Sequence, residues 1–249
     1  MARHAIFLDP LHTPAPGDRL TLEGDEAKHA ARVKRLVPGD IATLFNGRGL
    51  VAEAAVVDAK RSLTVDILST HTVEPIRPRI EVCSATPKGP RLDKMLDQLS
   101  QAGAAAWAPM STKLGVVDPR DTKLARMERI TIESAKQCTR PWALEIGERC
   151  SFDDAMTPDG DTTLVVADAR GAAYEPTGGA TVRIFVGPEG GLVPEELDAA
   201  TNAGARLVAL SPHILRIETA AVLATGAVLN AEHAGGYHPN PDHPRAETS

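Results

Sequence analysis

Aromatic side chains are scarce, since Phe, Trp and Tyr together make up only 3% of the 249 residues. A protein that binds nucleic acid mainly by stacking bases on rows of rings needs more of them, so we exclude that class. Basic residues are also in the minority, because 27 Lys and Arg stand against 33 Asp and Glu and give a net charge of −6. This balance argues against a protein that coats nucleic acid through a general positive charge.

Cysteine and long apolar runs are scarce too. The three cysteines, Cys83, Cys138 and Cys150, match no paired zinc-ligand spacing, and a small odd number is typical of a reducing cytosol. No apolar run approaches the roughly 20 residues of a membrane-spanning helix, and the first ten residues lack the apolar core of a signal peptide. We therefore expect a cytoplasmic protein without a membrane segment.

The common nucleotide and metal motifs are missing. The chain has no Gly-x-Gly-x-x-Gly after a strand, no Gly-Lys-Ser/Thr loop, no Gly-x-Ser-x-Gly and no His-Glu-x-x-His. His238 and His243 lie in a polar C-terminal tail, which we interpret as a tail rather than as a metal site. Chemistry based on NAD, ATP or Zn²⁺ is thus poorly supported, and no metal is expected.

Residues 182–219 are the most informative stretch. The apolar run 182–186 predicts a buried strand that stops at Gly187-Pro188-Glu189-Gly190-Gly191, and a helix is expected from Pro194 to about Gly204. A second apolar run, 207–210, precedes an irregular segment, 211–219, and a helix over 220–233. Two adjacent strands would thus each end in a special loop. Because ligands of open α/β sheets bind outside the carboxyl ends of strands, we expect a site there.

The rest of the chain predicts two domains and a tail. Short strands at 3–8, 41–45, 51–57 and 61–68, with a hairpin turn at Asn46-Gly47, indicate a β-rich module over residues 1–73. A helix over 25–36 would place Lys28, Arg32 and Arg35 on one face. Alternating strands and helices, including a helix over 123–140, indicate an α/β domain with a largely parallel sheet over 74–235. Residues 236–249 are expected to be disordered.

Several pieces of the chain carry a family resemblance. The string VGPEGGL, followed by LRIETAA, resembles the SPOUT class of methyltransferases and is most similar to the RsmE family, which methylates N3 of a uridine in 16S ribosomal RNA. The spacing His29-x-x-Arg32-Val33-x-Arg35, the loop Lys88-Gly89-x-Arg91 and the helix end Glu133-x-Ala135-x-Gln137-Cys138-x-Arg140 agree with that family in order. The chain departs from the family pattern at residues 97–103 and at Lys113-Leu114.

The resemblance implies an architecture and partners. It implies an N-terminal PUA-like β-barrel that binds RNA and a C-terminal SPOUT α/β domain whose chain end forms a trefoil knot. It also implies S-adenosylmethionine bound in the knot, a homodimer, and 16S rRNA as substrate, either as free RNA or within the small ribosomal subunit. Two alternatives stay open: a ribose 2′-O-methyltransferase of the same fold, and a non-catalytic RNA-binding factor of ribosome assembly.

The resemblance also selects site residues. We expect the methyl donor to contact Ala167, Val186, Gly187, Pro188, Glu189, Gly190, Gly191, Leu210, Ser211, Ile214, Leu215 and Thr219. Arg216 is the candidate cation that stabilises negative charge on the uracil, and Glu218, two residues on in an extended segment, would point to the same side. Glu218 either orients Arg216 or acts as general base, and we favour orienting because a neighbouring Arg lowers a carboxylate pKa. The expected RNA contacts are Lys28, Arg32, Arg35, Lys88, Arg91, Gln137 and Arg140.

Overall fold

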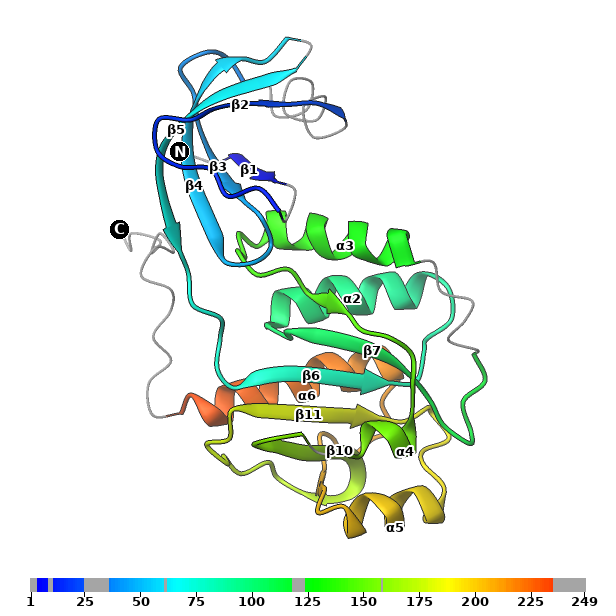
Figure 1. The fold of residues 1–249 in the computed structure, drawn as a ribbon. Coiled ribbons are helices and arrows are strands. Elements are labelled where there is room, and N and C mark those ends of the chain that lie inside the picture. The colour runs from blue at the N-terminus through cyan, green and yellow to red at the C-terminus, as the bar shows by residue number, and fades with distance from the viewer. Residues whose placement is uncertain are drawn as a thin grey trace, which may run out of the picture. The chain divides into compact units, whose positions relative to one another are not determined.

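A computed structural model describes residues 4–8, 11–24, 36–60, 62–117, 124–157 and 159–234. Its contacts form two compact units (Figure 1): residues 1–76, 88–107 and 120–148 make the first, and residues 77–87, 108–119 and 149–249 make the second. The tail 236–249 and the predicted helix face with Lys28, Arg32 and Arg35 lie outside the described residues. The domain boundaries at 73/74 and 235/236 stay predictions.

The first unit contains the predicted β-rich module. Its five strands lie in the order β1-β3-β4-β5-β2 and comprise β1 (His4–Phe7), β2 (Arg19–Leu22), β3 (Ile41–Phe45), β4 (Leu50–Asp58) and β5 (Leu63–Thr72). Neighbouring strands of this sheet are antiparallel, except that β1 runs parallel to β3. Alternate residues of β4 and β5 enter one apolar core, among them Ala54, Val56 and Val65. The predicted hairpin between β3 and β4 is confirmed.

The turn of that hairpin is fixed by a close approach. Asn46 Oδ1 accepts hydrogen bonds from the backbone N–H of Arg48 (2.9 Å) and Leu50 (3.2 Å). Gly49 has φ +91°, and a Cβ there would lie 2.5 Å from the Trp142 ring. Trp142 Nε1 in turn donates to the carbonyl oxygen of Val73 at 2.8 Å. Glycine is therefore required at position 49 both by the backbone conformation and by the ring that covers it.

Within the described residues, two helices accompany this sheet in the first unit. They are α2 (Pro90–Ala102) and α3 (Leu124–Gln137), which pack against each other. α2 ends at Gly103, which has φ 100° as expected for a glycine that stops a helix. The prediction that the second helix runs to residue 140 is wrong, because α3 stops at Gln137 and Thr139 adopts a left-handed φ of 55°. The chain thus leaves the helix before Pro141 is reached.

The second sheet is built from parallel pairs, as predicted. Its strand order is β12-β10-β11-β6-β7-β8, with β9 also beside β7. The strands are β6 (Arg79–Ser84), β7 (Ala106–Ser111), β8 (Glu145–Ile146), β9 (Cys150–Ser151), β10 (Thr162–Ala172), β11 (Thr181–Val186) and β12 (Arg206–Val208). The prediction that the two loop-bearing strands are adjacent is wrong, because β10 lies between β11 and β12.

The described part of the second unit contains the helices α4 (Phe152–Ala155), α5 (Pro194–Asn202) and α6 (Ile217–Glu232). Residues of α4 and α5 share one apolar cluster with Cys83 of β6 and Phe185 of β11. α6 also packs against β6 and β11, and Figure 1 shows it behind these strands while α4 lies in front. The two faces of the sheet are therefore covered by different helices.

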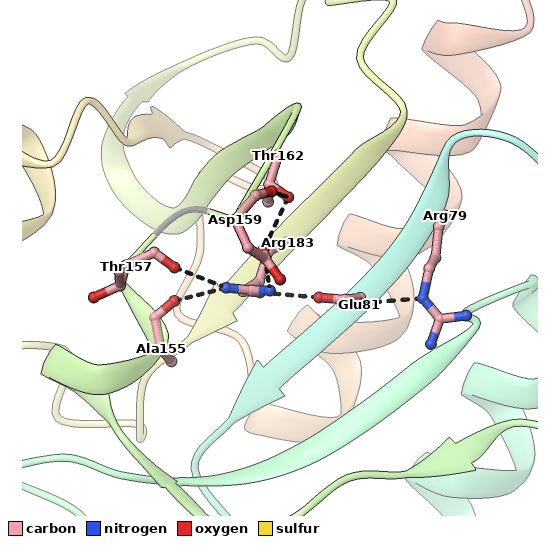
Figure 2. Close-up of polar contacts among 7 residues, drawn as sticks. All are labelled: Arg79, Glu81, Ala155, Thr157, Asp159, Thr162 and Arg183. Carbon is pink, nitrogen blue, oxygen red and sulfur yellow. Dashed lines mark hydrogen bonds and ion pairs between the residues drawn. The ribbon is translucent and has the colours of Figure 1, made fainter.

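A half-buried arginine, Arg183, connects the central strands of this sheet (Figure 2). Arg183 of β11 bonds to Glu81 of β6 (Nε–Oε2, 2.9 Å), to Asp159 (Nη2–Oδ1, 2.9 Å) and to the carbonyl oxygens of Ala155 and Thr157 (3.2 Å each). The positive charge of Arg183 lowers the pKa of Asp159. These bonds tie two central strands to the end of α4, so the carboxyl ends of β6 and β11 are held in register.

Candidate active site

The carboxyl ends of three parallel strands bring the predicted loops together. Val166 of β10 pairs with Phe185 of β11, and Ala167, the next residue, pairs with Val208 of β12. The loop 187–191 follows β11, and the loop 209–216 follows β12. Ala167 is half-buried between the strands that carry the two loops. β10, which separates the two strands, thus supplies a third side of the site.

The three glycines of the first loop are needed for different reasons. Gly191 has φ +77° and donates its N–H to the carbonyl oxygen of Pro188 at 2.8 Å, which closes a tight turn. A Cβ on Gly187 would lie 3.1 Å from Leu192, so space is short there. Gly190 has neither constraint, because its Cβ would meet only Leu114 at 3.6 Å, an ordinary contact. The fold itself therefore does not demand glycine at position 190.

Glu196 supports the first loop through two hydrogen bonds, a role that its position in a predicted helix did not reveal. It is buried in the first turn of α5, where Oε2 accepts from Val193 N at 3.0 Å and Oε1 accepts from Lys113 N at 2.8 Å. The second bond places the segment after β7 against this loop, where a Cβ on Gly190 would lie 3.6 Å from Leu114. Lys113-Leu114, a departure from the family pattern, thus adjoins the predicted donor loop.

The second loop is shaped by local bonds and by a bulge in β10. Ser211 Oγ accepts from His213 N at 3.1 Å, which closes a short turn. Between Ala167 and Ala172, β10 bulges away from β12, and a Cβ on Gly171 would lie 2.3 Å from the backbone of Leu207. The backbones at Gly171 and Leu207 therefore lie too close together for any residue with a Cβ at position 171.

The side chains of the predicted donor residues differ in exposure. Leu210 and Leu215 are half-buried, Ile214 is 87% exposed, and Glu189 and Thr219 are exposed. Val186 is buried, and its carbonyl oxygen accepts from Ala85 N at 2.9 Å. Val186 thus supports the first loop from the core, whereas Glu189, Ile214 and Thr219 are its exposed neighbours in the predicted donor site.

The expectation that Glu218 lies in an extended segment with Arg216 is wrong. Arg216 is the N-cap residue of α6, and its carbonyl oxygen accepts from Ala220 N at 2.9 Å, so the helix begins at Ile217 rather than at Ala220. Glu218 lies in the first helical turn, where residues two apart point to nearly opposite sides. Arg216 is exposed and Glu218 is 8% exposed. An acidic side chain in that turn is favourable because the N-terminus of a helix carries partial positive charge.

The other end of α6 is held by a hydrogen-bonded carboxylate. Glu232 accepts from Tyr174 Oη (2.6 Å), Thr177 N (2.8 Å), Thr177 Oγ1 (3.1 Å) and Gly178 N (3.2 Å). Burial, reinforced by the bond to Glu232, raises the pKa of Tyr174 to about 12. These bonds join the segment that leaves β10 to the last turn of the helix that begins at Arg216.

The expected RNA contacts that lie within the described residues all belong to the first unit. Lys88 is exposed and lies just before α2, Arg91 is half-buried in its first turn, and Gln137 is exposed at the end of α3. Arg140 differs, because its Nη1 donates to the carbonyl oxygen of Ser100 at 2.7 Å and its burial lowers its pKa. Arg140 thus satisfies a carbonyl near the end of α2, a structural role that the spacing did not reveal.

The described part of the chain contains neither a membrane-spanning helix nor a metal-binding cluster. No helix there has both the length and the apolar character needed to cross a membrane. Within the same residues, no group of three or more His, Cys, Asp or Glu side chains is arranged to hold a metal ion.

Comparison with known proteins adds to this geometry. A model described as RNA methyltransferase domain matches residues 74–229, and one described as RNA methyltransferase PUA domain matches residues 22–68. A protein from Mycobacterium bovis named ribosomal RNA small subunit methyltransferase E is 31% identical over 242 residues, or 92% of each chain. A relative of the same name from Bacillus subtilis is 25% identical and covers 84% of this chain and 88% of its own.

Two solved structures have the same fold. A Legionella pneumophila protein, described as a methyltransferase and solved with the bound cofactor SAM, gives a TM-score of 0.79 at 26% identity, over 95% of this chain and 99% of its own. A ribosomal RNA small subunit methyltransferase E from Neisseria gonorrhoeae, bound to S-adenosyl methionine, gives 0.80 at 24% identity, over 90% and 96%. At 24% identity, the likeness to the Neisseria gonorrhoeae protein shows a shared fold.

Proposed function

Because the chain belongs to the ribosomal RNA small subunit methyltransferase E family, we propose that it transfers a methyl group from S-adenosylmethionine to N3 of a uridine in 16S rRNA. The observation that carries this proposal is the convergence of the loops after β11 and β12 beside Ala167. We further propose that the enzyme acts in the cytoplasm, on RNA or on the small ribosomal subunit.

The residues of the two loops fit S-adenosylmethionine. At Gly190 the fold leaves room for a Cβ, which glycine lacks. We propose that the donor lies against the backbone in the space that this Cβ would fill. Gly187 to Gly191 would hold the donor from one side, and Leu210, Ser211 and Leu215 from the other. The sulfonium of the bound donor supplies an electrophilic methyl group. The task of the protein is then to hold the acceptor nitrogen in line, and such positioning is worth about 7–11 kcal/mol.

Arg216 is the group that we assign to the acceptor. The N3 proton of uridine must leave, and negative charge develops on the neighbouring carbonyl oxygens of the base. An exposed guanidinium at the start of α6 would stabilise that charge. Glu218 stays in the proposal as a buried carboxylate of the same turn. We propose that it positions Arg216 rather than acting as the base, because a neighbouring arginine lowers a carboxylate pKa and so weakens it as a base.

The RNA is proposed to bind the first unit through cations. Within the described residues these cations are Lys88, Arg91 and the partly bonded Arg140, with Gln137 as a neutral contact, and Lys28, Arg32 and Arg35 lie outside the described residues. Because cations that neutralise phosphates release counterions, affinity for RNA should fall steeply as salt is raised. Binding that is insensitive to salt between 50 and 200 mM, roughly the range over which phosphate contacts lose affinity, would remove these contacts from the proposal.

A homodimer and a trefoil knot are also proposed. α6 is rich in apolar residues, yet Thr219, Leu223, Gly226 and Asn230 form an exposed face on it, and a Cβ on Gly226 would meet nothing within 4 Å. An apolar helix with an open face and a central glycine is suited to a second copy of the chain. The close passage of Gly171 past Leu207 supports threading of the chain at this place.

Methyl transfer by the purified protein tests the proposed function. The protein is incubated with S-adenosylmethionine labelled in the methyl group and with small ribosomal subunits from a strain that lacks the enzyme, and the RNA is digested to nucleosides. We expect label in 3-methyluridine. Label on the ribose would favour the 2′-O-methyltransferase, and donor binding without transfer to any RNA would favour a non-catalytic factor.

A further inference from the structure

Thr86 is a buried polar residue that has no role in the proposed methyl transfer as described so far. It lies two residues beyond the end of β6 and is 4% exposed. Within the described part of the chain, its Oγ1 has no hydrogen-bond partner. Burial of a hydroxyl without a partner is unfavourable, so a partner that arrives from outside the fold is expected.

The strand geometry places Thr86 beside the first loop. Ser84 pairs with Val186, and Ala85 N donates to the carbonyl oxygen of Val186 at 2.9 Å, so the chain keeps its course past the end of β6. Gly187 follows directly on the neighbouring strand. Thr86 therefore lies next to the point at which the glycine loop begins.

Alternation along β6 places Thr86 on the side of α6. Cys83 belongs to the apolar cluster formed with α4 and α5, and alternate side chains of a strand point to opposite faces. Val82, Ser84 and, by continuation, Thr86 therefore point to the other face, where α6 packs against β6 and β11. α6 begins next to Arg216, so the unpaired hydroxyl and the proposed catalytic cation belong to the same side of the sheet.

We propose that the Thr86 hydroxyl binds the pyrimidine base of the acceptor nucleotide. The residues assigned to the methyl donor follow β10, β11 and β12, whereas β6 lies on the opposite side of β11 from β10. A hydroxyl both donates and accepts, so it suits a uracil edge, which presents carbonyl oxygens beside an N–H. Thr86 would thus help to orient N3, and a site that bonds such an edge discriminates against bases that lack it. The identity of the base rests on the proposed function.

Thr86→Val and Thr86→Ser test this assignment. Valine keeps the shape and removes the hydroxyl, so we expect the free protein to be as heat-stable as the wild type or more so. We expect kcat/KM for the small subunit to fall about tenfold, the size of one lost hydrogen bond to a buried group, while the Kd of S-adenosylmethionine stays within about twofold. Thr86→Ser should restore most of the activity.

Thr225→Val is the matched control. Thr225 is also a fully buried threonine of this unit, but its hydroxyl donates to the carbonyl oxygen of Ala221 at 2.9 Å, so it has no need of a ligand. We expect normal kcat/KM per folded molecule. Wild-type kcat/KM in Thr86→Val would overturn the proposal, and so would a loss confined to the affinity for S-adenosylmethionine.

A binding measurement separates this proposal from the proposed function. If the wild type transfers no methyl group, the proposed function fails. Thr86 is then judged by the affinity of a labelled 16S rRNA fragment in the presence of S-adenosylhomocysteine, measured by fluorescence anisotropy. Weaker binding by Thr86→Val than by wild type and Thr225→Val supports the contact. Equal binding by all three proteins overturns it.

Discussion

Gly190 and Gly191 are neighbours in the chain, but different physical constraints act on them. Gly191 needs a positive φ, which a residue with a Cβ adopts only with strain. Gly190 has no positive φ, and a Cβ there would make only an ordinary contact with Leu114, so the fold does not require glycine at this position and the proposed donor gives a reason for it. The sequence pattern predicted that the loop turns or lies against something; the structure confirms the turn at Gly191, and the approach of a ligand to Gly190 stays a prediction.

Substitution of each glycine by alanine separates the two constraints. Gly190→Ala should unfold at the wild-type temperature but bind S-adenosylmethionine at least about tenfold more weakly, because one methyl group occupies the space proposed for the donor. Gly191→Ala should lose about 1–2 kcal/mol of stability from left-handed strain. Thermal unfolding and isothermal titration measure both quantities. Wild-type affinity in a stable Gly190→Ala protein would mean that the donor does not approach this backbone.

Arg216 is the residue whose loss should affect chemistry more than donor binding. Arg216→Ala should lower kcat about 10²–10³-fold, the usual effect of removing one group that stabilises developing charge. The Kd of S-adenosylmethionine should stay close to the wild-type value. Arg206→Ala, which removes an exposed arginine of β12, serves as the control. Full activity of Arg216→Ala would exclude this residue from the mechanism.

Glu218 illustrates what residue patterns leave undetermined. The polar, proline-broken stretch 211–219 predicted an extended segment through position 218. Backbone bonding starts the helix at Ile217 instead, and this buries the carboxylate that was expected to accompany Arg216. A helix boundary depends on which carbonyl accepts the first bond, and short patterns do not determine that within three residues.

At the scale of elements, α6 links the site to the far end of its unit. Its first turn follows Arg216, and its last residue, Glu232, is held by Tyr174, Thr177 and Gly178. Strands and helices of this unit were mostly predicted from apolar runs and from glycine and proline stops. The insertion of β10 between β11 and β12 was not, because strand order depends on pairings between distant residues that local patterns do not encode.

The bond between Tyr174 and Glu232 predicts a pH dependence at the alkaline end. The folded state raises the pKa of Tyr174 to about 12, above its unfolded value of about 10. A group with a raised pKa contributes stability that is fully present below the unfolded value and lost as the pH rises through the folded value. The wild type should therefore lose stability between about pH 10 and 12 that Tyr174→Phe does not lose. Parallel unfolding curves for the two proteins against pH would contradict this.

At the scale of the whole molecule, the family resemblance predicted more of the architecture than the composition and periodicity of the sequence did. The PUA-like module and the SPOUT-type α/β domain agree with the matching family models and with solved relatives. Parallel pairing was predictable from alternating strands and helices. The knot and the dimer were not predictable in this way, because threading and self-association leave no periodic signal in one chain.

The proposed homodimer can be tested on the exposed face of α6. Gly226→Arg should convert a dimer to a monomer, because a long charged side chain would fill the open space at position 226. Light scattering coupled to gel filtration measures the mass. Asp198→Arg on the exposed face of α5 is the control and should leave the dimer intact. A wild type that is monomeric at micromolar concentration would refute the dimer itself.

The most direct test of the central claim is mass spectrometry of 16S rRNA from a strain in which the gene is deleted. We predict that one 3-methyluridine disappears, that the wild-type gene restores it, and that the Arg216→Ala gene does not. Unchanged 3-methyluridine in the deletion strain, or the loss of a ribose methyl group instead, would contradict the account.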